Sequence, residues 1–327
     1  MSTSECIVVV AGSGGTLGKL VVEATLARAR QEWRRVLVRG LVRREGGSAA
    51  AAAPEATSLT TADQRLVVVP VDYGSPEELR HACAGADCVV STLQGLEDVI
   101  VGVQSGLLAA AIASGVKRFV PSDFSGDFRK LPEGSHRNFD LRRRFHEAAD
   151  RLILEARSPI TLTSIFQGGF TELLASGWVL FDYKKRQVSY FGSPDAPMEF
   201  TTWRNTAEYT AAVAMDPNPV PRALFVAGQR LSPKEAQALA RRVTGAEFGL
   251  KRVMPTWLLG VVIALMKFFM PGKKGDVMPL WVGMQYGYCG ALGLMSPARL
   301  DNERYPGITW TAVDQVVRDA FAASPAA

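Results

Sequence analysis

The sequence has few of the residues that bind metals or form disulfides. It contains four cysteines and three histidines in 327 residues. The cysteines are widely scattered, and none forms a metal-like pair with a histidine: Cys6, Cys83, Cys88 and Cys289. We therefore expect a reduced, cytoplasmic protein without a metal site.

The chain also lacks a long apolar run and a recognisable secretory signal. No basic segment followed by an apolar one precedes Cys6. The most apolar segment, Met254 to Met270, is short for a membrane helix, which needs about 20 apolar residues, and contains Pro255 and Lys267 near its ends. No membrane span is expected. A helix that lines a substrate cavity or a dimer contact is favoured over membrane insertion.

An excess of charge that would suit nucleic acid is missing as well. The net charge is +5, and the arginines fall mostly at predicted strand ends and helix faces without interleaved aromatic residues. A phosphate-rich small ligand explains this modest charge more simply than nucleic acid does.

A glycine-rich turn follows the first apolar segment of the chain. Four branched apolar residues, Ile7 to Val10, precede it, and Lys19 to Arg30 follow in a helix-compatible pattern. Glycines allow a tight turn, let the backbone approach phosphates and let the helix pack on the strand, while the helix N-terminus faces negative charge. This order predicts a dinucleotide site formed by Gly12, Ser13, Gly14, Gly15, Thr16, Leu17 and Gly18.

No acidic residue stands at the end of the second predicted strand, where Val36 to Val42 gives way to Arg43 and Arg44. An acid there would bond the ribose 2′-hydroxyl of NAD and repel a 2′-phosphate, whereas a guanidinium can fork onto that phosphate. The sequence therefore favours NADP(H). Solvated arginines at a strand end would give the same pattern.

Strands and helices alternate along the first half of the chain. Further strands are expected at Leu66 to Val71, Asp87 to Ser91, Lys117 to Pro121 and Ile160 to Ile165, and helices at Pro76 to Ala84 and Asp98 to Ser114. A low-complexity surface loop is expected at Gly46 to Pro54. This alternation predicts an α/β fold with a Rossmann doubly wound parallel sheet.

The alternation becomes less regular from Gly168 onward. We expect an NADP-binding domain at residues 1–167 and a smaller C-terminal α+β substrate domain at 168–327, with some later segments able to return to the sheet. Within the second domain, Phe181 to Phe191 is expected to form two short strands about a basic turn. The cluster Trp281, Met284, Tyr286 and Tyr288 fits an aromatic lid or plain core equally.

Later segments complete a family resemblance that covers nearly the whole chain. The glycine turn is followed in order by Leu41 to Arg44, by Gly115 to Phe124 with its sequence Val-Pro-Ser-Asp-Phe, by Phe200 to Thr202 and by Gln229 to Glu235. This ordered set resembles the NmrA-like and isoflavone-reductase-like branch of atypical short-chain dehydrogenases.

The resemblance implies where a cofactor would lie. Gly12 to Leu17 would lie under the pyrophosphate, Arg43, with Arg44 beside it, against the 2′-phosphate, and Asp72 near the adenine. Beside the adenosine ribose and pyrophosphate would lie Thr92, Leu93 and Gln94. Near the nicotinamide would lie Pro121, Ser122, Asp123 and Phe124.

The usual proton donors of these enzymes are missing. Typical short-chain dehydrogenases use a tyrosine with a lysine four positions later, and none of the seven tyrosines has that lysine. By resemblance, isoflavone-reductase-like enzymes use a lysine on the helix after the fifth strand. Counting back from Pro159 puts His146 at or near that position, with Lys130 and His136 as further candidates. A half-buried structural histidine is the competing interpretation of His146.

Three function classes follow from these observations. The favoured one is an NADPH-dependent reductase of a small apolar, aromatic or conjugated carbonyl substrate. The alternative is a non-catalytic NADP(H) redox sensor that binds a partner protein, as NmrA-type regulators do by resemblance; a homodimer is also open. The third is a membrane-surface protein anchored by residues 254–270.

Overall fold

A six-stranded parallel sheet forms the centre of the first half of the chain in the computed structural model, which describes residues 5–32, 35–44, 65–177 and 179–324. The strand order is β3-β2-β1-β4-β5-β6. All five neighbouring pairs run parallel. The strands are β1 (Cys6–Ala11), β2 (Val36–Arg43), β3 (Leu66–Val71), β4 (Cys88–Ser91), β5 (Arg118–Val120) and β6 (Thr161–Leu162). This order confirms the predicted Rossmann fold, and it brings all six carboxyl strand ends to one edge.

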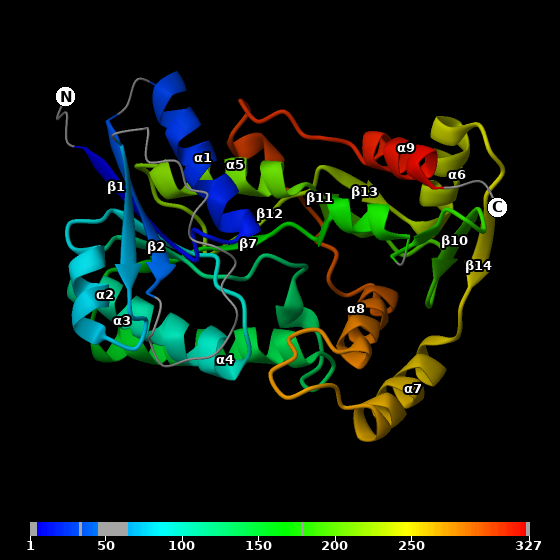
Figure 1. Ribbon diagram of the computed structural model, residues 1–327, viewed down its shortest axis with the longest axis horizontal. Coiled ribbons are helices and arrows are strands. Elements are labelled where there is room, and N and C mark those ends of the chain that lie inside the picture. Colours follow the sequence, from blue (N-terminus) through cyan, green and yellow to red (C-terminus); the bar gives the residue numbers. More distant parts are fainter. Residues whose placement is uncertain (1–4, 33–34, 45–64, 178, 325–327) are drawn as a thin grey trace. The chain divides into compact units, whose positions relative to one another are not determined.

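The central strands are apolar without alternation because helices cover both faces of the sheet. Val8, Val9 and Val10 of β1 are all fully buried. Helix α1 lies on one face, and α2, α3 and α4 lie on the other (Figure 1). Their bounds are α1 (Thr16–Gln31), α2 (Pro76–Cys83), α3 (Gln104–Ala113) and α4 (Arg137–Glu155).

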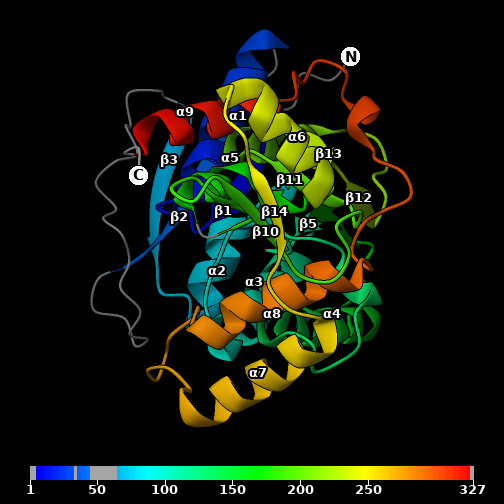
Figure 2. The same cartoon turned by 90° about the vertical axis from the view of Figure 1, so that its right-hand side faces the viewer.

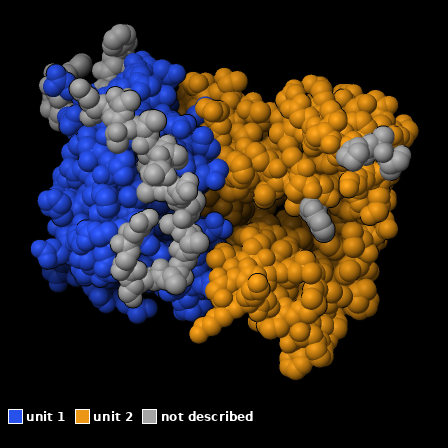
Figure 3. Space-filling model, in the orientation of Figure 1, with its two compact units in different colours: residues 1–123, 141–165, 206–224 blue, residues 124–140, 166–205, 225–327 orange. Residues whose placement is uncertain are grey.

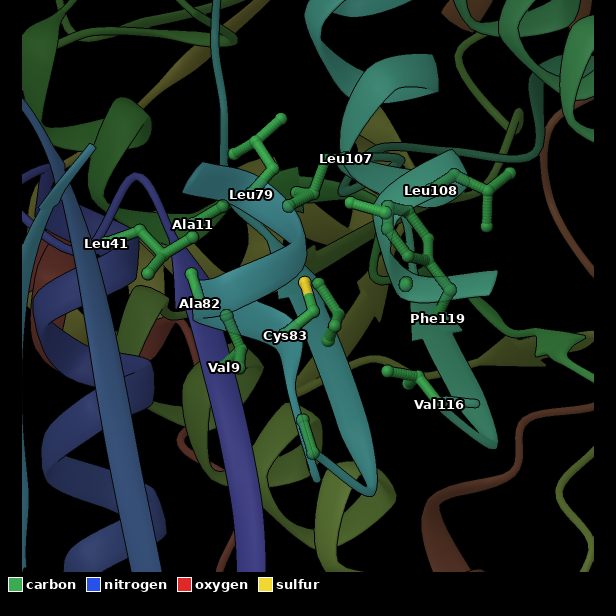
Figure 4. Close-up of a cluster of buried hydrophobic side chains, with 14 of the residues drawn as sticks. Val9, Ala11, Leu41, Leu79, Ala82, Cys83, Leu107, Leu108, Val116 and Phe119 are labelled. Atoms are coloured by element: carbon green, nitrogen blue, oxygen red, sulfur yellow. The ribbon is translucent and has the colours of Figure 1, made fainter. Parts of the chain in front are cut away.

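The core between the sheet and the second helical layer is built from aliphatic and aromatic side chains (Figure 4). Leu79 of α2 and Leu107 of α3 are 1% and 0% exposed, and both belong to the cluster that contains Val9 and Leu41 of the sheet. Phe119 of β5 faces Phe145 of α4, with ring centroids 6.2 Å apart. This packing fixes α4, and therefore its polar residues, against the ends of β5 and β6.

Two predicted elements differ from the structure. The predicted strand at Ile160 to Ile165 divides at Thr163: β6 joins the main sheet, whereas β7 (Ser164–Phe166) pairs with β12 (Ala223–Phe225). The chain changes partner there, because Thr163 donates its amide to Phe119 and Ser164 donates to Arg222. The predicted helix at Asp98 to Ser114 begins as a π-helix, η2 (Asp98–Val103), before α3.

A buried arginine of the sheet binds the end of a later helix and the turn after it. Helix α5 (Trp203–Met215) is followed by a turn whose carbonyls are held by Arg118 of β5. The Arg118 guanidinium donates to the carbonyls of Val213, Asp216 and Asn218. The guanidinium thus supplies hydrogen-bond donors to carbonyls at the end of the helix, where no intrahelical amide remains to bond them.

The chain forms two compact units (Figure 3). Unit 1 contains residues 1–123, 141–165 and 206–224, and unit 2 contains residues 124–140, 166–205 and 225–327. Each unit therefore draws on three separate segments. The division by binding role, with cofactor before residue 168 and substrate after it, stays a prediction. The predicted loop at Gly46 to Pro54 lies outside the described residues.

Unit 2 contains two small sheets and two pairs of packed helices, α6 with α9 and α7 with α8. One sheet has the order β14-β10-β9 and the other β13-β11-β8. Their strands are β8 (Gly169–Phe170), β9 (Phe181–Asp182), β10 (Gln187–Tyr190), β11 (Met198–Thr201), β13 (Gln229–Leu231) and β14 (Gly249–Arg252). The helices are α6 (Pro233–Thr244), α7 (Thr256–Phe269), α8 (Leu280–Leu292) and α9 (Asp314–Ala323). Short 3-10 helices complete the chain: η3 (Phe128–Lys130), η4 (Thr171–Ser176) and η5 (Asn302–Arg304).

Local sequence explains two of these elements. Strands β9 and β10 pair antiparallel about the basic turn at Lys184 and Lys185, which confirms the predicted hairpin. Ser232 and Glu235 form a reciprocal capping box at the start of α6, and Gly245 ends the helix with φ +69°.

Candidate functional site

The glycine turn at the end of β1 has no space for a side chain at its last position. Gly12 has φ +77°, a conformation that favours glycine. A Cβ at Gly18 would lie 2.2 Å from the Gly12 carbonyl oxygen. Helix α1 therefore packs directly on the turn, as the sequence predicts. A Cβ at Gly15 would lie 3.4 Å from that oxygen, which is ordinary contact, so the fold itself does not require glycine there.

Side chains from two other strand ends hold the turn in place. The Tyr73 hydroxyl accepts the Gly12 amide at 3.1 Å and donates to the Leu41 carbonyl at 3.3 Å. Ser13 donates both its amide and its hydroxyl to Leu41. Thr92 donates its hydroxyl to the Ala11 carbonyl at 2.8 Å. Burial raises the pKa of Tyr73 to about 12, against the Gly12 hydrogen bond and nearby Arg43, so the phenol stays protonated.

The first turn of α1 fits a negatively charged group. Its N-cap is Gly15 in an extended conformation, with no side-chain cap and no acid in the first turn. Backbone amides at such a terminus have no intrahelical acceptors, and the helix dipole favours an anion there. Within residues 12–17, the amides of Gly12, Ser13 and Gly15 donate inside the fold. The amides of Gly14, Thr16 and Leu17 are therefore the ones that suit a dinucleotide pyrophosphate.

The two predicted phosphate-binding arginines have different surroundings. Arg44 forks onto Glu78 of α2, with nitrogen to oxygen distances of 3.0 and 2.9 Å. Glu78 also accepts the backbone amide of Asp72. Arg43 acts electrostatically on Tyr73 beside the glycine turn. Arg44 is therefore already paired with a carboxylate of the fold. Glu78 is a partner that the sequence analysis missed, because it lies on the next helix.

The loops after β4 and β5 are joined by Ser122. Its hydroxyl donates to the Leu93 carbonyl at 2.8 Å, and its amide donates to the Gln104 side chain at 2.9 Å. Leu93 is buried and Gln94 is exposed. The structure thus brings the predicted ribose and nicotinamide segments of unit 1 together. Pro121 is buried beside Ser122, and Phe124, also buried, begins a segment of unit 2.

His146 of α4 meets Asp123 at the end of β5. Its Nε2 lies 2.6 Å from Asp123 Oδ2, and the Ser164 hydroxyl donates to the same oxygen at 2.7 Å. Asp123 is fully buried, and the His146 side chain is 16% exposed. Arg142, one turn earlier on α4, donates to the Ser122 carbonyl. Ser164 and Arg142 had no sequence signal as site residues, since both depend on how α4 and β7 meet the sheet edge.

Each member of this pair favours the charged form of the other. Burial alone would raise the pKa of Asp123, but the His146 charge and the hydrogen bonds from His146 and Ser164 hold that pKa below its usual range. Burial alone would lower the pKa of His146, but the Asp123 carboxylate raises that pKa above its usual range. The contact therefore favours a half-buried imidazolium beside the buried Asp123 carboxylate, at the edge that carries the glycine turn.

The other two candidate proton donors lie in unit 2 and have other partners. Lys130 Nζ is 3.9 Å from the buried carboxylate of Asp127. His136 is fully buried, with its ring 4.2 Å from Phe139 and 4.1 Å from Tyr286. Tyr286, from the predicted aromatic cluster, therefore packs on His136. Of the three candidates, the structure brings His146 into the cluster at the ends of β5 and β6.

A pair of glycine substitutions separates binding from folding. Gly15→Val is expected to abolish NADPH binding while leaving the unfolding midpoint nearly unchanged, because the fold accepts a Cβ there but the pyrophosphate should touch backbone. Gly18→Val is expected to lower the midpoint as well, because its Cβ overlaps the Gly12 carbonyl. Calorimetric titration and thermal unfolding measure both. Normal NADPH binding by Gly15→Val would make the turn purely structural.

The His146 and Asp123 pair should give stability a defined pH dependence. Because the folded pKa of His146 is raised, its contribution is complete below its unfolded pKa of about 6.5 and is lost as pH rises through the folded pKa. The lowered pKa of Asp123 gives a contribution present above its unfolded pKa and lost in acid. His146→Gln should be less stable by about 3 kcal/mol at pH 6, and the difference should narrow toward pH 9. Urea unfolding that shows a pH-independent difference would rule out this charge pair.

The sequence matches the NmrA-like family over residues 4–270. It is 27% identical over 271 residues to oxidoreductase swnN of Metarhizium robertsii, covering 74% of each chain. It is 25% identical over 253 residues to oxidoreductase aprR of Aspergillus flavus, covering 75% of this chain and 76% of that protein.

Solved structures share the fold at low sequence identity. AtPrR2 with NADP+ and (+)pinoresinol has a TM-score of 0.74 and 20% identity, and covers 97% of this chain and 99% of its own. An isoflavone reductase has a TM-score of 0.71 and 19% identity with the same coverage. Leucoanthocyanidin reductase with NADPH from Vitis vinifera has a TM-score of 0.70 and 17% identity, again with 97% and 99% coverage. The resemblance found in the sequence is confirmed: the chain belongs to the NmrA-like family.

Proposed function

We propose that this protein is an NADPH-dependent reductase of a small apolar substrate, an aromatic or conjugated carbonyl compound. The observation that carries the proposal is the contact of His146 with the buried Asp123, which lies at the same sheet edge as the glycine turn. One edge thus offers both a cradle for a dinucleotide and a group that can move a proton.

Residues of unit 1 support NADPH as the cofactor. The amides at the start of α1 would hold the pyrophosphate, and Arg43 would hold the 2′-phosphate. Asp72, Thr92, Leu93 and Gln94 would contact the adenosine half, and Pro121, Ser122, Asp123 and Phe124 the nicotinamide half. The bound cofactor supplies a hydride. Solved relatives with NADP+ or NADPH, and curated relatives named oxidoreductases, support this assignment.

His146 is proposed to give the proton that accompanies hydride transfer. The Asp123 carboxylate raises the pKa of His146 above its usual range, which favours the protonated imidazole that a general acid requires. Asp123 faces Nε2 of the imidazole, and Asp123 and Ser164 together orient the ring. Lys130 and His136 are weaker candidates, because each is already engaged within unit 2.

Aromatic residues in unit 2 support an apolar substrate. Phe170, which follows β7 by four residues, lies 5.9 Å from Trp203, ring centroid to centroid, and both side chains are half-buried. Aromatic pairs of this kind bind planar apolar groups through large, weakly polar surfaces. Glu172 accepts the Trp203 amide and fixes the start of α5.

Arg43 should decide the choice of cofactor. The protein is expected to bind NADPH more tightly than NADH, and Arg43→Glu should reverse that preference, because one charge-assisted bidentate contact contributes about 1.5 to 3 kcal/mol, or roughly tenfold or more in affinity. Arg44→Gln is the matched control and should change the preference by less than about threefold, since Glu78 already holds Arg44. Equal dissociation constants for the two cofactors in the unmodified protein would remove the basis for this assignment.

His146→Ala should lower kcat by about 10² to 10⁴-fold, with the NADPH dissociation constant nearly unchanged. His146→Lys is the informative companion, because by resemblance related enzymes place a lysine there, and it should restore part of the rate with a shifted pH profile. Steady-state kinetics on an identified substrate, with the pH profile of kcat, measures both. Full activity in His146→Ala would make the residue structural.

The function itself is tested by consumption of NADPH across a panel of enones and quinones. The reductase proposal expects at least one member to be reduced in a reaction that Gly15→Val abolishes. If no member is reduced, and NADPH and NADP+ differ in their effect on affinity for a protein partner, the sensor alternative replaces the reductase.

A further inference from the structure

Exposed apolar side chains are concentrated on one helix of unit 2. Of fourteen large apolar side chains that are exposed among the described residues, ten lie between Val253 and Leu294. Five of them form what we call the α7 face: Trp257, Val261, Leu265, Phe268 and Phe269. Trp257, Phe268 and Phe269 are 72%, 77% and 72% exposed. The first four recur at steps of four, four and three residues, so they share one side of the helix.

The opposite side of α7 is already packed within the unit. Leu259 and Ile263 are 0% and 7% exposed, and Gly260 faces Tyr288 of α8. Helix α7 lies at the outer edge of unit 2, with α8 on its inner side (Figure 2). A helix that is apolar all round is normally covered all round. The unit covers only half of α7, so the α7 face is a surface that something else should cover.

The charges in the segment that carries this face, residues 248–275, have one sign, and one acid flanks it at each end, Glu247 and Asp276. Residues 248–275 contain five basic side chains and no acid, which equals the whole net charge of +5. These residues are all exposed: Lys251, Arg252, Lys267, Lys273 and Lys274. Lys267 lies 5.6 Å from the Trp281 ring, and the Trp281 indole donates to the Pro271 carbonyl at 3.0 Å. Trp281 thereby holds the turn that carries Lys273 and Lys274 against the end of the helix.

We propose that the α7 face binds the surface of a bilayer that contains anionic phospholipid. The aromatic and aliphatic side chains would enter the boundary between headgroups and acyl chains, and the lysines would contact lipid phosphates. The helix would lie in the plane of the surface, since α7 has 14 residues and no helix in the described parts of the chain is long and apolar enough to cross a membrane.

Charge favours a lipid surface over a second copy of the chain. In a two-fold dimer built on α7, the same basic segment of both copies would meet, and residues 248–275 supply no acid to pair with it. An anionic bilayer supplies the opposite charge along the whole segment. Apolar contact contributes most of the binding energy, and each lysine adds a smaller, salt-dependent part.

Sedimentation with vesicles tests the proposal on the full chain. Vesicles of phosphatidylcholine with about a quarter phosphatidylglycerol should bind the protein more strongly than pure phosphatidylcholine, and salt should weaken the difference. Phe268→Ser with Phe269→Ser should reduce partitioning about a hundredfold. Lys273→Glu with Lys274→Glu should reduce it by about thirtyfold or more.

A matched control separates the effect of charge at this face from the effect of the protein's net charge. Arg80→Glu with Arg151→Glu makes the same charge change at exposed positions of α2 and α4 in unit 1, and should alter partitioning by less than about threefold. Unchanged circular dichroism and NADPH affinity in every variant show that the fold is intact. Absence of vesicle binding by the unmodified protein overturns the proposal. A dimer in light scattering that the phenylalanine substitutions dissociate, without vesicle binding, assigns the face to a second copy instead.

Discussion

The close approach of α1 to the end of β1 is the constraint on which unit 1 depends. A Cβ at Gly18 would overlap the Gly12 carbonyl, so the helix can begin directly over the turn only without one. Tyr73, from the end of β3, then holds Gly12 and the Leu41 carbonyl together. The same contacts that join three neighbouring strand ends also aim the first amides of α1 outward. Packing and anion recognition therefore have one physical cause.

The parallel sheet brings the other polar residues of the candidate site to the edge that carries the glycine turn. Every strand of the six-stranded sheet ends on the same side, so loops distant in sequence meet there. Ser122 joins the loops after β4 and β5, and Asp123 then receives His146 from α4 and Ser164 from β7. Since Asp123 is fully buried, its charge is stable only with these partners. The pair is thus coupled to the packing of α4.

Sequence reasoning succeeded where local pattern decides the structure and failed where distant segments meet. The apolar run before Gly12 and the alternation that follows predicted the sheet and its carboxyl edge, and the Phe181 to Phe191 pattern predicted a hairpin. The division of Ile160 to Ile165 at Thr163 could not be predicted, because Ser164 pairs with Arg222, 58 positions later. The roles of Tyr73, Glu78 and Ser164 were missed for the same reason, since each partner lies on another element.

The account rests on a dinucleotide cradle and a proton-transferring pair at one sheet edge, and a crystal structure of the protein with NADPH tests both most directly. We expect the pyrophosphate over the glycine turn and the first amides of α1, the 2′-phosphate against Arg43, and the nicotinamide within reach of His146 and Asp123. A cofactor bound away from the glycine turn, or a nicotinamide ring that His146 cannot reach, would contradict it.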